Sequence, residues 1–225
     1  EARAAKRARV EKEKAQKAQK MKKHTVSLAV DHPDTGYTLY LQGDDTGFAE
    51  RARFRLLAQL ISSPFYEDIR TNRQLGYIVY ATPFEMLETP ALGLVVQSPA
   101  TGPEQIDAAV RAFAEQFEAR LSNLDEAQLQ REKQAVISRL LEKERQLGDV
   151  SGRYWREIDR QATGFDSRQR LAEAIRAVTR DELVDTLRRS LLERQHALRV
   201  TTGGEGLDET AALEQLTRQP AVPAG

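Results

Sequence analysis

The sequence of 225 residues contains no cysteine and only three histidines. Without cysteine the chain cannot form a disulfide, a thiolate nucleophile or a cysteine-ligated zinc site. His24, His32 and His196 do not form the H-x-x-E-H arrangement, which places two zinc ligands on one helical face. The sequence also contains no G-x-S-x-G nucleophile elbow and no glycine-rich phosphate-binding loop. We therefore predict that this chain alone is an incomplete enzyme or no enzyme, and that it binds no metal or cofactor by itself.

Long apolar runs are also missing. None approaches the roughly 18 apolar residues that a membrane-spanning helix needs, so we expect no membrane partner. The charged N-terminus has no apolar signal-peptide core. A hydrophobic fraction of 40% is enough for a core, and a charged fraction of 30% predicts a soluble domain.

The formal net charge of zero hides an asymmetry. Residues 1–23 contain ten lysines and arginines against three glutamates. Such a basic segment could bind nucleic acid, but it lacks aromatic residues and any basic motif beyond its composition. Its composition is more typical of a solvated helix. We therefore expect no nucleic-acid partner, and we interpret residues 1–24 as a charged helical linker or the end of a preceding domain.

The hydrophobic pattern predicts five strands and a series of helices. Alternating apolar residues predict strands at residues 25–30, 37–41, 77–81, 92–97 and 196–201. A loop with Pro83 and Pro90 is expected between the third and fourth strands. Apolar stripes predict a helix from about residue 48 that breaks at residues 62–64, then a short helix to residue 72. Further helices are predicted at residues 103–121, 125–147 and 150–162, after residue 166, and after a capping box at residues 179–182.

Adjacent strands and grouped helices together predict an α+β fold. We expect one mainly antiparallel sheet with helices packed on one face. Ile106, Val110, Phe113 and Phe117 are the predicted inner face of the helix over residues 103–121. Residues 25–202 are the predicted domain, and residues 203–225 are expected to form a mobile tail.

The most informative segment runs from Phe65 to Val79 and contains Arg-Thr-Asn-Arg-Gln-Leu-Gly-Tyr at residues 70–77. It resembles the LRT-x-x-QLGY-x-V signature in the fourth, C-terminal domain of the pitrilysin and insulysin (insulinase) family. Ile69 stands where that family usually has leucine. Smaller similarities at Tyr40, before Pro64, at residues 92–98 and at residues 154–158 extend the resemblance over about residues 25–201.

The resemblance implies one domain of a four-domain zinc metalloendopeptidase whose two halves close around a chamber. Zinc would lie in a missing N-terminal domain. This domain would close the chamber and contact peptide substrates, with the N-terminal zinc-binding half, or a partner subunit, as its partner. It implies a periplasmic location if the protein is like bacterial pitrilysin, and a cytoplasmic one otherwise. The alternative is a non-catalytic scaffold or accessory subunit of the same family.

The resemblance also implies roles for two residues, Arg70 in substrate binding and Tyr77 in substrate binding and catalysis. A phenol O–H preset at the scissile carbonyl would stabilise the charge that develops in the transition state. Gly76 would let the backbone pass close by, and the guanidinium of Arg70 would hold substrate carbonyls or a carboxylate. The residues alone favour a structural interpretation, with Tyr77 as an edge of the core and Arg70 as a charge at a helix C-terminus, and the resemblance reverses that preference.

Other residues have simpler interpretations. Arg73 and Gln74 are candidates for orienting the turn before Tyr77. His32, with Asp31 and Asp34 beside it, is interpreted as part of a solvated turn rather than a metal site. We predict Trp155 in the core. Four aromatic residues line either a chamber wall or the core, and the sequence does not decide between these for Phe65, Tyr66, Tyr80 and Phe84.

Overall fold

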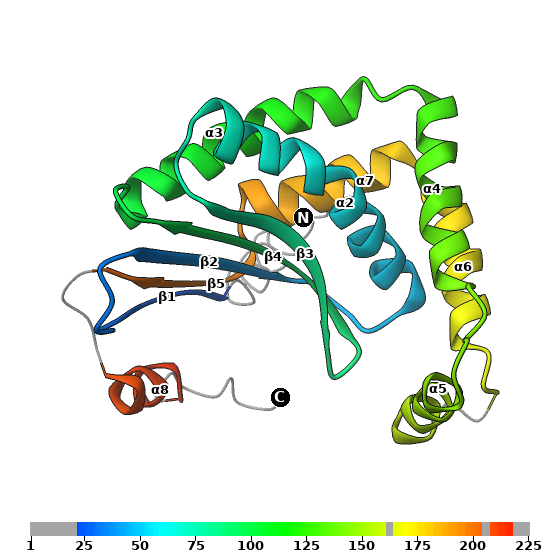
Figure 1. The fold of residues 1–225 in the computed structure, drawn as a ribbon. Helices are drawn as coiled ribbons and strands as arrows, with labels where there is room; N and C mark the ends of the chain where they lie inside the picture. The colour runs from blue at the N-terminus through cyan, green and yellow to red at the C-terminus, as the bar shows by residue number, and fades with distance from the viewer. Residues whose placement is uncertain (1–21, 161–163, 204–207, 218–225) are drawn as a thin grey trace, which may run out of the picture.

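The computed structural model describes residues 22–160, 164–203 and 208–217. Its strands form one five-stranded sheet in the order β1-β5-β2-β4-β3 (Figure 1). Neighbouring strands are antiparallel except β1 and β5, which are parallel. The strands are β1 (Lys22–Leu28), β2 (Thr35–Gln42), β3 (Ile78–Met86), β4 (Thr89–Ser98) and β5 (His196–Thr202).

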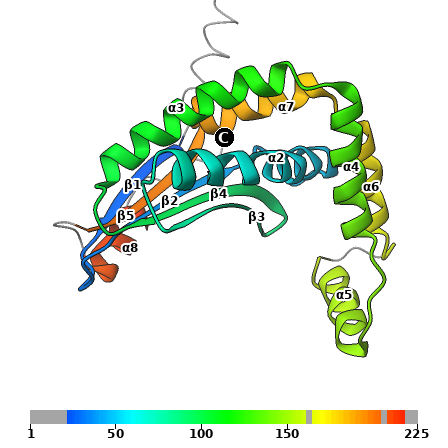
Figure 2. The ribbon, with the colours of Figure 1, turned by 45° about the horizontal axis from the view of Figure 1, so that its top comes forward.

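Helices cover one face of this sheet, as Figure 2 shows for α2, α3 and α7. The fold is therefore α+β with a mainly antiparallel sheet, which confirms the prediction. The α-helices are α2 (Phe48–Tyr66), α3 (Pro103–Ser122), α4 (Glu126–Leu140), α5 (Leu147–Asp159), α6 (Ser167–Ala177), α7 (Arg180–Leu187) and α8 (Glu209–Thr217). Two π-helical turns extend α2 and α7, η1 (Glu67–Asn72) and η2 (Arg188–Leu192).

The core lies between the sheet and these helices. Along β2, every second side chain from Tyr37 to Leu41 is fully buried, as expected for a strand with one covered face. The predicted inner face of α3 is buried as well, at Ile106, Val110, Phe113 and Phe117. Two rings of this face, Phe113 and Phe117, stack with centroids 5.6 Å apart.

The break predicted at residues 62–64 does not occur. Helix α2 continues through Pro64 and passes directly into η1. A proline inside a helix costs one backbone hydrogen bond. Here Phe65 and Ile69 on either side of the junction are fully buried, and this apolar burial offsets the lost bond. Wider π-helical spacing then carries the chain to Asn72.

The loop predicted around Pro83 and Pro90 is also wrong, because both prolines lie within strands. The turn is tighter and occurs at Leu87 and Glu88, whose φ angles are 48° and 66°. Two consecutive positive φ angles are typical of a type I′ hairpin turn. Strand β3 lies at the edge of the sheet, so the missing N–H of Pro83 is tolerated.

Helix α4 ends earlier than predicted, at Leu140, and α5 begins at Leu147. Helix α5 lies beyond the ends of α4 and α6, away from the sheet (Figures 1 and 2). The placement of Trp155 in the core is therefore wrong, because it is 61% exposed on α5. Too little of the domain packs against α5 to bury its apolar side.

The predictions for the two ends of the chain can be compared with the structure only in part. The helix expected in residues 1–24 lies mainly outside the described residues, although β1 begins at Lys22. Within residues 203–225, where a mobile tail is expected, the structure contains α8, which contacts β1. Ala212 of this helix is buried.

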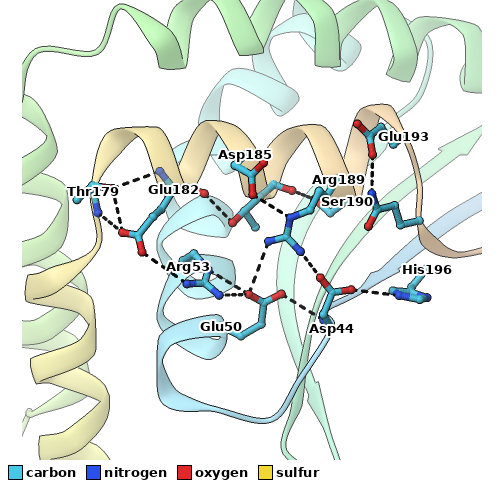
Figure 3. Close-up of polar contacts among 12 residues, drawn as sticks. Asp44, Glu50, Arg53, Thr179, Glu182, Asp185, Arg189, Ser190, Glu193 and His196 are labelled. Carbon is cyan, nitrogen blue, oxygen red and sulfur yellow. Dashed lines mark hydrogen bonds and ion pairs between the residues drawn. The ribbon is translucent and has the colours of Figure 1, made fainter. Parts of the chain in front are cut away.

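A polar network joins α2, α7 and the end of β2 (Figure 3). Glu50 is 1% exposed and accepts hydrogen bonds from Arg53 and from the backbone N–H of Asp44. Arg189 pairs with Asp44, whose carboxylate also lies 3.1 Å from His196 Nε2. The predicted capping box between Thr179 and Glu182 is confirmed at the start of α7.

A second buried polar cluster joins the sheet to α3. The hydroxyl of Tyr37 donates to Asp107 at 2.6 Å, and Arg194 Nη1 donates to the same carboxylate oxygen at 2.7 Å. Burial alone would raise the pKa of Asp107, but the hydrogen bonds from Tyr37 and Arg194 hold it below its usual value. Burial, together with the bond to Asp107, raises the pKa of Tyr37.

We expect Tyr37→Phe to lower the free energy of unfolding by about 1–3 kcal/mol, because Asp107 loses a buried donor. The pKa of Asp107 is depressed in the folded protein. Its contribution is therefore present above the unfolded pKa and is lost as pH falls through the folded pKa. Losing the tyrosine bond raises the folded pKa toward the unfolded value, so the acid-dependent loss of stability should be smaller in the variant and should end at higher pH. Urea unfolding over a pH series measures both effects.

The matched control is Tyr40→Phe, on the same strand but the opposite face. No hydrogen bond of the Tyr40 hydroxyl is found among the described residues. An equal loss of stability in the two variants would contradict a specific role for the Tyr37 bond.

Candidate functional site

The segment from Arg70 to Tyr77 leaves η1 and enters β3 through a tight connection. The N–H of Arg73 donates to the carbonyl of Asp68, and the N–H of Leu75 donates to that of Ile69. A side-chain bond of 2.8 Å between Arg73 Nε and Asp68 Oδ2 closes the same turn. Gln74 has a φ of 55°, in the left-handed region. The structure thus places Arg73 and Gln74 in the turn that precedes Tyr77.

Gly76 lies against the neighbouring strand β4. A Cβ atom at this position would be 2.6 Å from the carbonyl oxygen of Gln97 and 2.8 Å from Val96 Cγ1. Both contacts are too short for any other residue without movement of the backbone. The next residue, Tyr77, donates its N–H to the same Gln97 carbonyl at 3.0 Å. The expected close approach at Gly76 is therefore confirmed, and it places the backbone of Tyr77 beside β4.

The Tyr77 side chain is on the surface, with 46% exposure. Its hydroxyl donates to Asp34 Oδ2 at 2.6 Å, and Gln97 Nε2 donates to the same oxygen at 3.2 Å. This bond to a carboxylate stabilises the neutral phenol and raises the pKa of Tyr77. The phenol is therefore protonated and exposed, as a hydrogen-bond donor to a bound molecule must be.

Arg70 is exposed at the end of η1. Its guanidinium lies 5.2 Å from the centroid of the Tyr66 ring, a cation–π distance. Within the described part of the chain it forms no ion pair. Arg70 and Tyr77 therefore reach the surface from the two ends of one turn, but with different partners, and the described contacts do not join them.

Asp34 was missed as a site residue by sequence reasoning. It belongs to the turn between β1 and β2, where the sequence predicts only solvent contact, and its partner Tyr77 lies 43 residues away. The nearby His32 is not arranged as a metal ligand, since its Nδ1 accepts the N–H of Asp34 at 3.1 Å. Among the described residues, no group of three or more histidines and carboxylates could hold a metal ion.

The four aromatic residues left open by the sequence divide into two groups. Phe65 is fully buried and packs edge-on against Phe113, so it belongs to the core. Tyr66, Tyr80 and Phe84 are each more than 40% exposed. The ring of Phe84 lies directly over Gly93, where a Cβ would be 2.4 Å from Phe84 Cε2.

Comparison with known proteins finds similarity to peptidases. Residues 56–155 match the family model described as PQQ synthase PqqF-like, C-terminal lobe domain 4. The human insulin-degrading enzyme is 26% identical over 203 residues, which cover 85% of this chain and 20% of the enzyme. The chain is thus similar to the C-terminal domain of insulinase-family proteins. Protease 3 of Escherichia coli K12 is 29% identical over 169 residues, which cover 75% of the chain and 17% of that protein.

Solved structures confirm the fold. The crystal structure of pitrilysin superposes with a TM-score of 0.75 at 24% identity, over 85% of this chain and 20% of that one. A peptidase M16 inactive domain from Pseudomonas fluorescens gives a TM-score of 0.60 at 15% identity, over 84% of this chain and 45% of that one. The chain spans about a fifth of the length of the curated relatives that it matches.

No helix in the described ranges has both the length and the apolar character to cross a membrane.

We expect Asp34→Asn to lower the pKa of Tyr77, because a neutral amide replaces the carboxylate that stabilises the protonated phenol. A pH titration of the tyrosine Cζ resonances by ¹³C NMR measures this, with the Tyr77 signal assigned by its loss in Tyr77→Phe. Asp31→Asn, in the same turn, is the control and should leave the Tyr77 titration unchanged. An unaltered titration in Asp34→Asn would contradict the bond as described.

Proposed function

We propose that this chain is the C-terminal domain of a zinc-dependent metalloendopeptidase. In this proposal it closes the substrate chamber and contacts peptide substrates, with Arg70 and Tyr77 as its site residues. The observation that carries the proposal is the exposed, protonated Tyr77 hydroxyl, held in place by the Gly76 contact. Similarity to the insulinase family supports it. We propose residues 25–202 as the domain, preceded by a linker or the end of another domain.

Zinc, in this proposal, is held by residues outside this chain. The donors present here do not fit a zinc site. His32 Nδ1 accepts a backbone N–H, and His196 Nε2 faces Asp44 at 3.1 Å. Neither histidine has a second histidine or carboxylate arranged with it as a tetrahedral ligand set within the described residues. The partner would be the zinc-binding half of the same protein or a separate subunit.

The role of Tyr77 follows from its hydrogen bond. Peptide hydrolysis develops negative charge on the scissile carbonyl oxygen, and a donor aimed at that oxygen stabilises the transition state more than the ground state. The Tyr77 proton is donated to Asp34 in the chain as it stands. A bound substrate would exchange this acceptor for its own carbonyl oxygen. Because the phenol is already exposed, the exchange requires no rearrangement of the core.

Arg70 would act as a holding group. Its guanidinium is exposed and carries five N–H donors in a planar fork. The Tyr66 ring supports one face of that fork at 5.2 Å. This leaves the edges of the guanidinium available for substrate carbonyl oxygens or for a carboxylate from the other half of the protein.

A second candidate is a non-catalytic scaffold or accessory subunit. The similar Pseudomonas fluorescens structure is described as an inactive domain, which keeps this alternative open. The coding sequence upstream of residue 1 discriminates between the two. An in-frame H-x-x-E-H motif supports the peptidase. The similar PqqL structure is described as a periplasmic protease of Escherichia coli, and we propose the periplasm here, with the cytoplasm as the alternative.

In the polypeptide that joins this chain to its H-x-x-E-H domain, we expect Tyr77→Phe to lower kcat about 100-fold with little change in KM. This is the usual effect of removing one donor to a developing oxyanion. Steady-state hydrolysis of a quenched fluorescent peptide measures both constants.

Tyr80→Phe is the matched control, since Tyr80 is 44% exposed on the strand that Tyr77 precedes. It should keep the wild-type kcat. A wild-type kcat in Tyr77→Phe would remove Tyr77 from the mechanism.

A further inference from the structure

A cleft lined by arginines lies at the end of the domain where α5 is attached. It has a volume of about 410 Å³ and is bounded by α2, β3, α4, α5 and α6. Seven arginines line it, together with Glu85 and Glu157. We call this feature the arginine cleft. Neither Arg70 nor Tyr77 is in its lining.

The acidic residues around the arginine cleft do not balance its positive charge. The Glu85 carboxylate accepts hydrogen bonds from Nε and Nη2 of Arg51, at 3.2 and 3.0 Å. It also forms an ion pair with Arg160. Glu144, at the rim, pairs with both Arg153 and Arg168. With Glu88 at the rim and Glu157 in the lining, four glutamates face seven arginines. A surplus of three positive charges remains.

Three of the lining arginines have no carboxylate partner within the described ranges. They come from three different helices, Arg55 from α2, Arg139 from α4 and Arg156 from α5. Arg139 donates only to the neutral Gln59, at 3.3 Å. The unpaired charges therefore converge on one space from three sides, instead of lying along one solvated helix face.

Arg55 is the most confined of the three. Burial lowers its pKa, and the charges of Arg51 and Arg160 lower it further, against the opposing effect of Glu85. A guanidinium in this position is desolvated and repelled by its neighbours, without a neutralising bond of its own. An anion in the cleft would relieve this cost, because it would supply the missing acceptor.

A second, more apolar cleft adjoins the first. It measures about 390 Å³ and shares Arg55, Arg139 and Leu140 with the arginine cleft. Apolar side chains line most of the remainder, namely Ala58, Ala81, Pro83 and Val136. A molecule lying along both clefts would therefore meet Arg156 at one end, Arg55 and Arg139 where the clefts join, and an apolar floor at the other end.

We propose that the two clefts together bind an acidic segment of a peptide, in which carboxylate side chains lie next to an apolar side chain. Arg55, Arg139 and Arg156 would donate to the carboxylates, and the apolar side chain would lie between α2, β3 and α4. A small inorganic anion would use only the arginine half. The choice of a peptide as occupant rests on the proposed function, which brings peptides to this domain.

The test is calorimetric titration of the chain at low salt with acetyl-Glu-Glu-Leu-Leu-amide. The same peptide with glutamine in place of glutamate serves as the uncharged control. We expect saturable binding of the acidic peptide that weakens as salt rises, and no binding of the glutamine peptide. Equal binding of both peptides, or of neither, overturns the proposal. So does saturable binding of inorganic triphosphate without binding of the acidic peptide.

The site is assigned by variants. We expect Arg55→Gln to weaken binding of the acidic peptide about ten-fold, as for loss of one hydrogen bond to a charged group. Arg156→Gln should also weaken it, and this exposed position keeps the test valid if Arg55→Gln unfolds. Arg145→Gln is the matched control, since Arg145 is 85% exposed and pairs with Glu142 outside the cleft. Wild-type affinity in both Arg55→Gln and Arg156→Gln overturns the proposal.

The calorimetric titration measures peptide binding and not peptide hydrolysis. Tyr77→Phe should therefore bind the acidic peptide as the wild type does, whatever its effect on kcat. A failed titration would leave the proposed role of Tyr77 untouched, and an unchanged kcat in Tyr77→Phe would leave the arginine cleft untouched.

Discussion

The carbonyl oxygen of Gln97 accepts the N–H of Tyr77, and a Cβ atom at residue 76 would lie 2.6 Å from the same oxygen. Several parts of the chain converge on it. Helix α2 and its π-helical extension deliver the chain to the turn, since Phe65 and Ile69 anchor both in the core. Strand β4 supplies the acceptor from the inside of the sheet. Asp34, from the turn before β2, then accepts the phenol proton. A side chain on the surface is thus positioned by residues from three parts of the chain.

The pairing of charged side chains differs between the middle of the domain and the end that carries α5. Near the middle, buried carboxylates join different elements, as where Asp107 joins Tyr37 to Arg194. Glu50 likewise joins α2 to Arg189 of η2 (Figure 3). At the end that carries α5, arginines outnumber their partners. Unpaired charge is costly in a confined space. The convergence of three unpaired arginines on one cleft is the physical reason to look for a ligand there.

Much of the fold can be predicted from the sequence, because apolar spacing controls it. The alternation from Tyr37 to Leu41 and the helical stripe that contains Phe113 correspond to buried faces. Predictions failed where tertiary contacts outweigh local preference. Pro64 remains inside a helix because its neighbours are buried, and Pro83 lies in a strand because that strand is at the sheet edge. Trp155 is exposed because α5 extends past the rest of the domain. The bond from Tyr77 to Asp34 could not be predicted, since no local pattern links residues so distant in the sequence.

The exposure of Trp155 has a practical consequence. It is the single tryptophan of the chain, and it lies on the helix that supplies Arg156 and Arg160 to the arginine cleft. Six tyrosines are the other appreciable emitters, so excitation at the red edge of the absorption band selects one indole ring at a known place. The molecule therefore carries its own optical label on α5. Its emission colour and its accessibility to a quencher report on that helix alone, without a dye or an added residue.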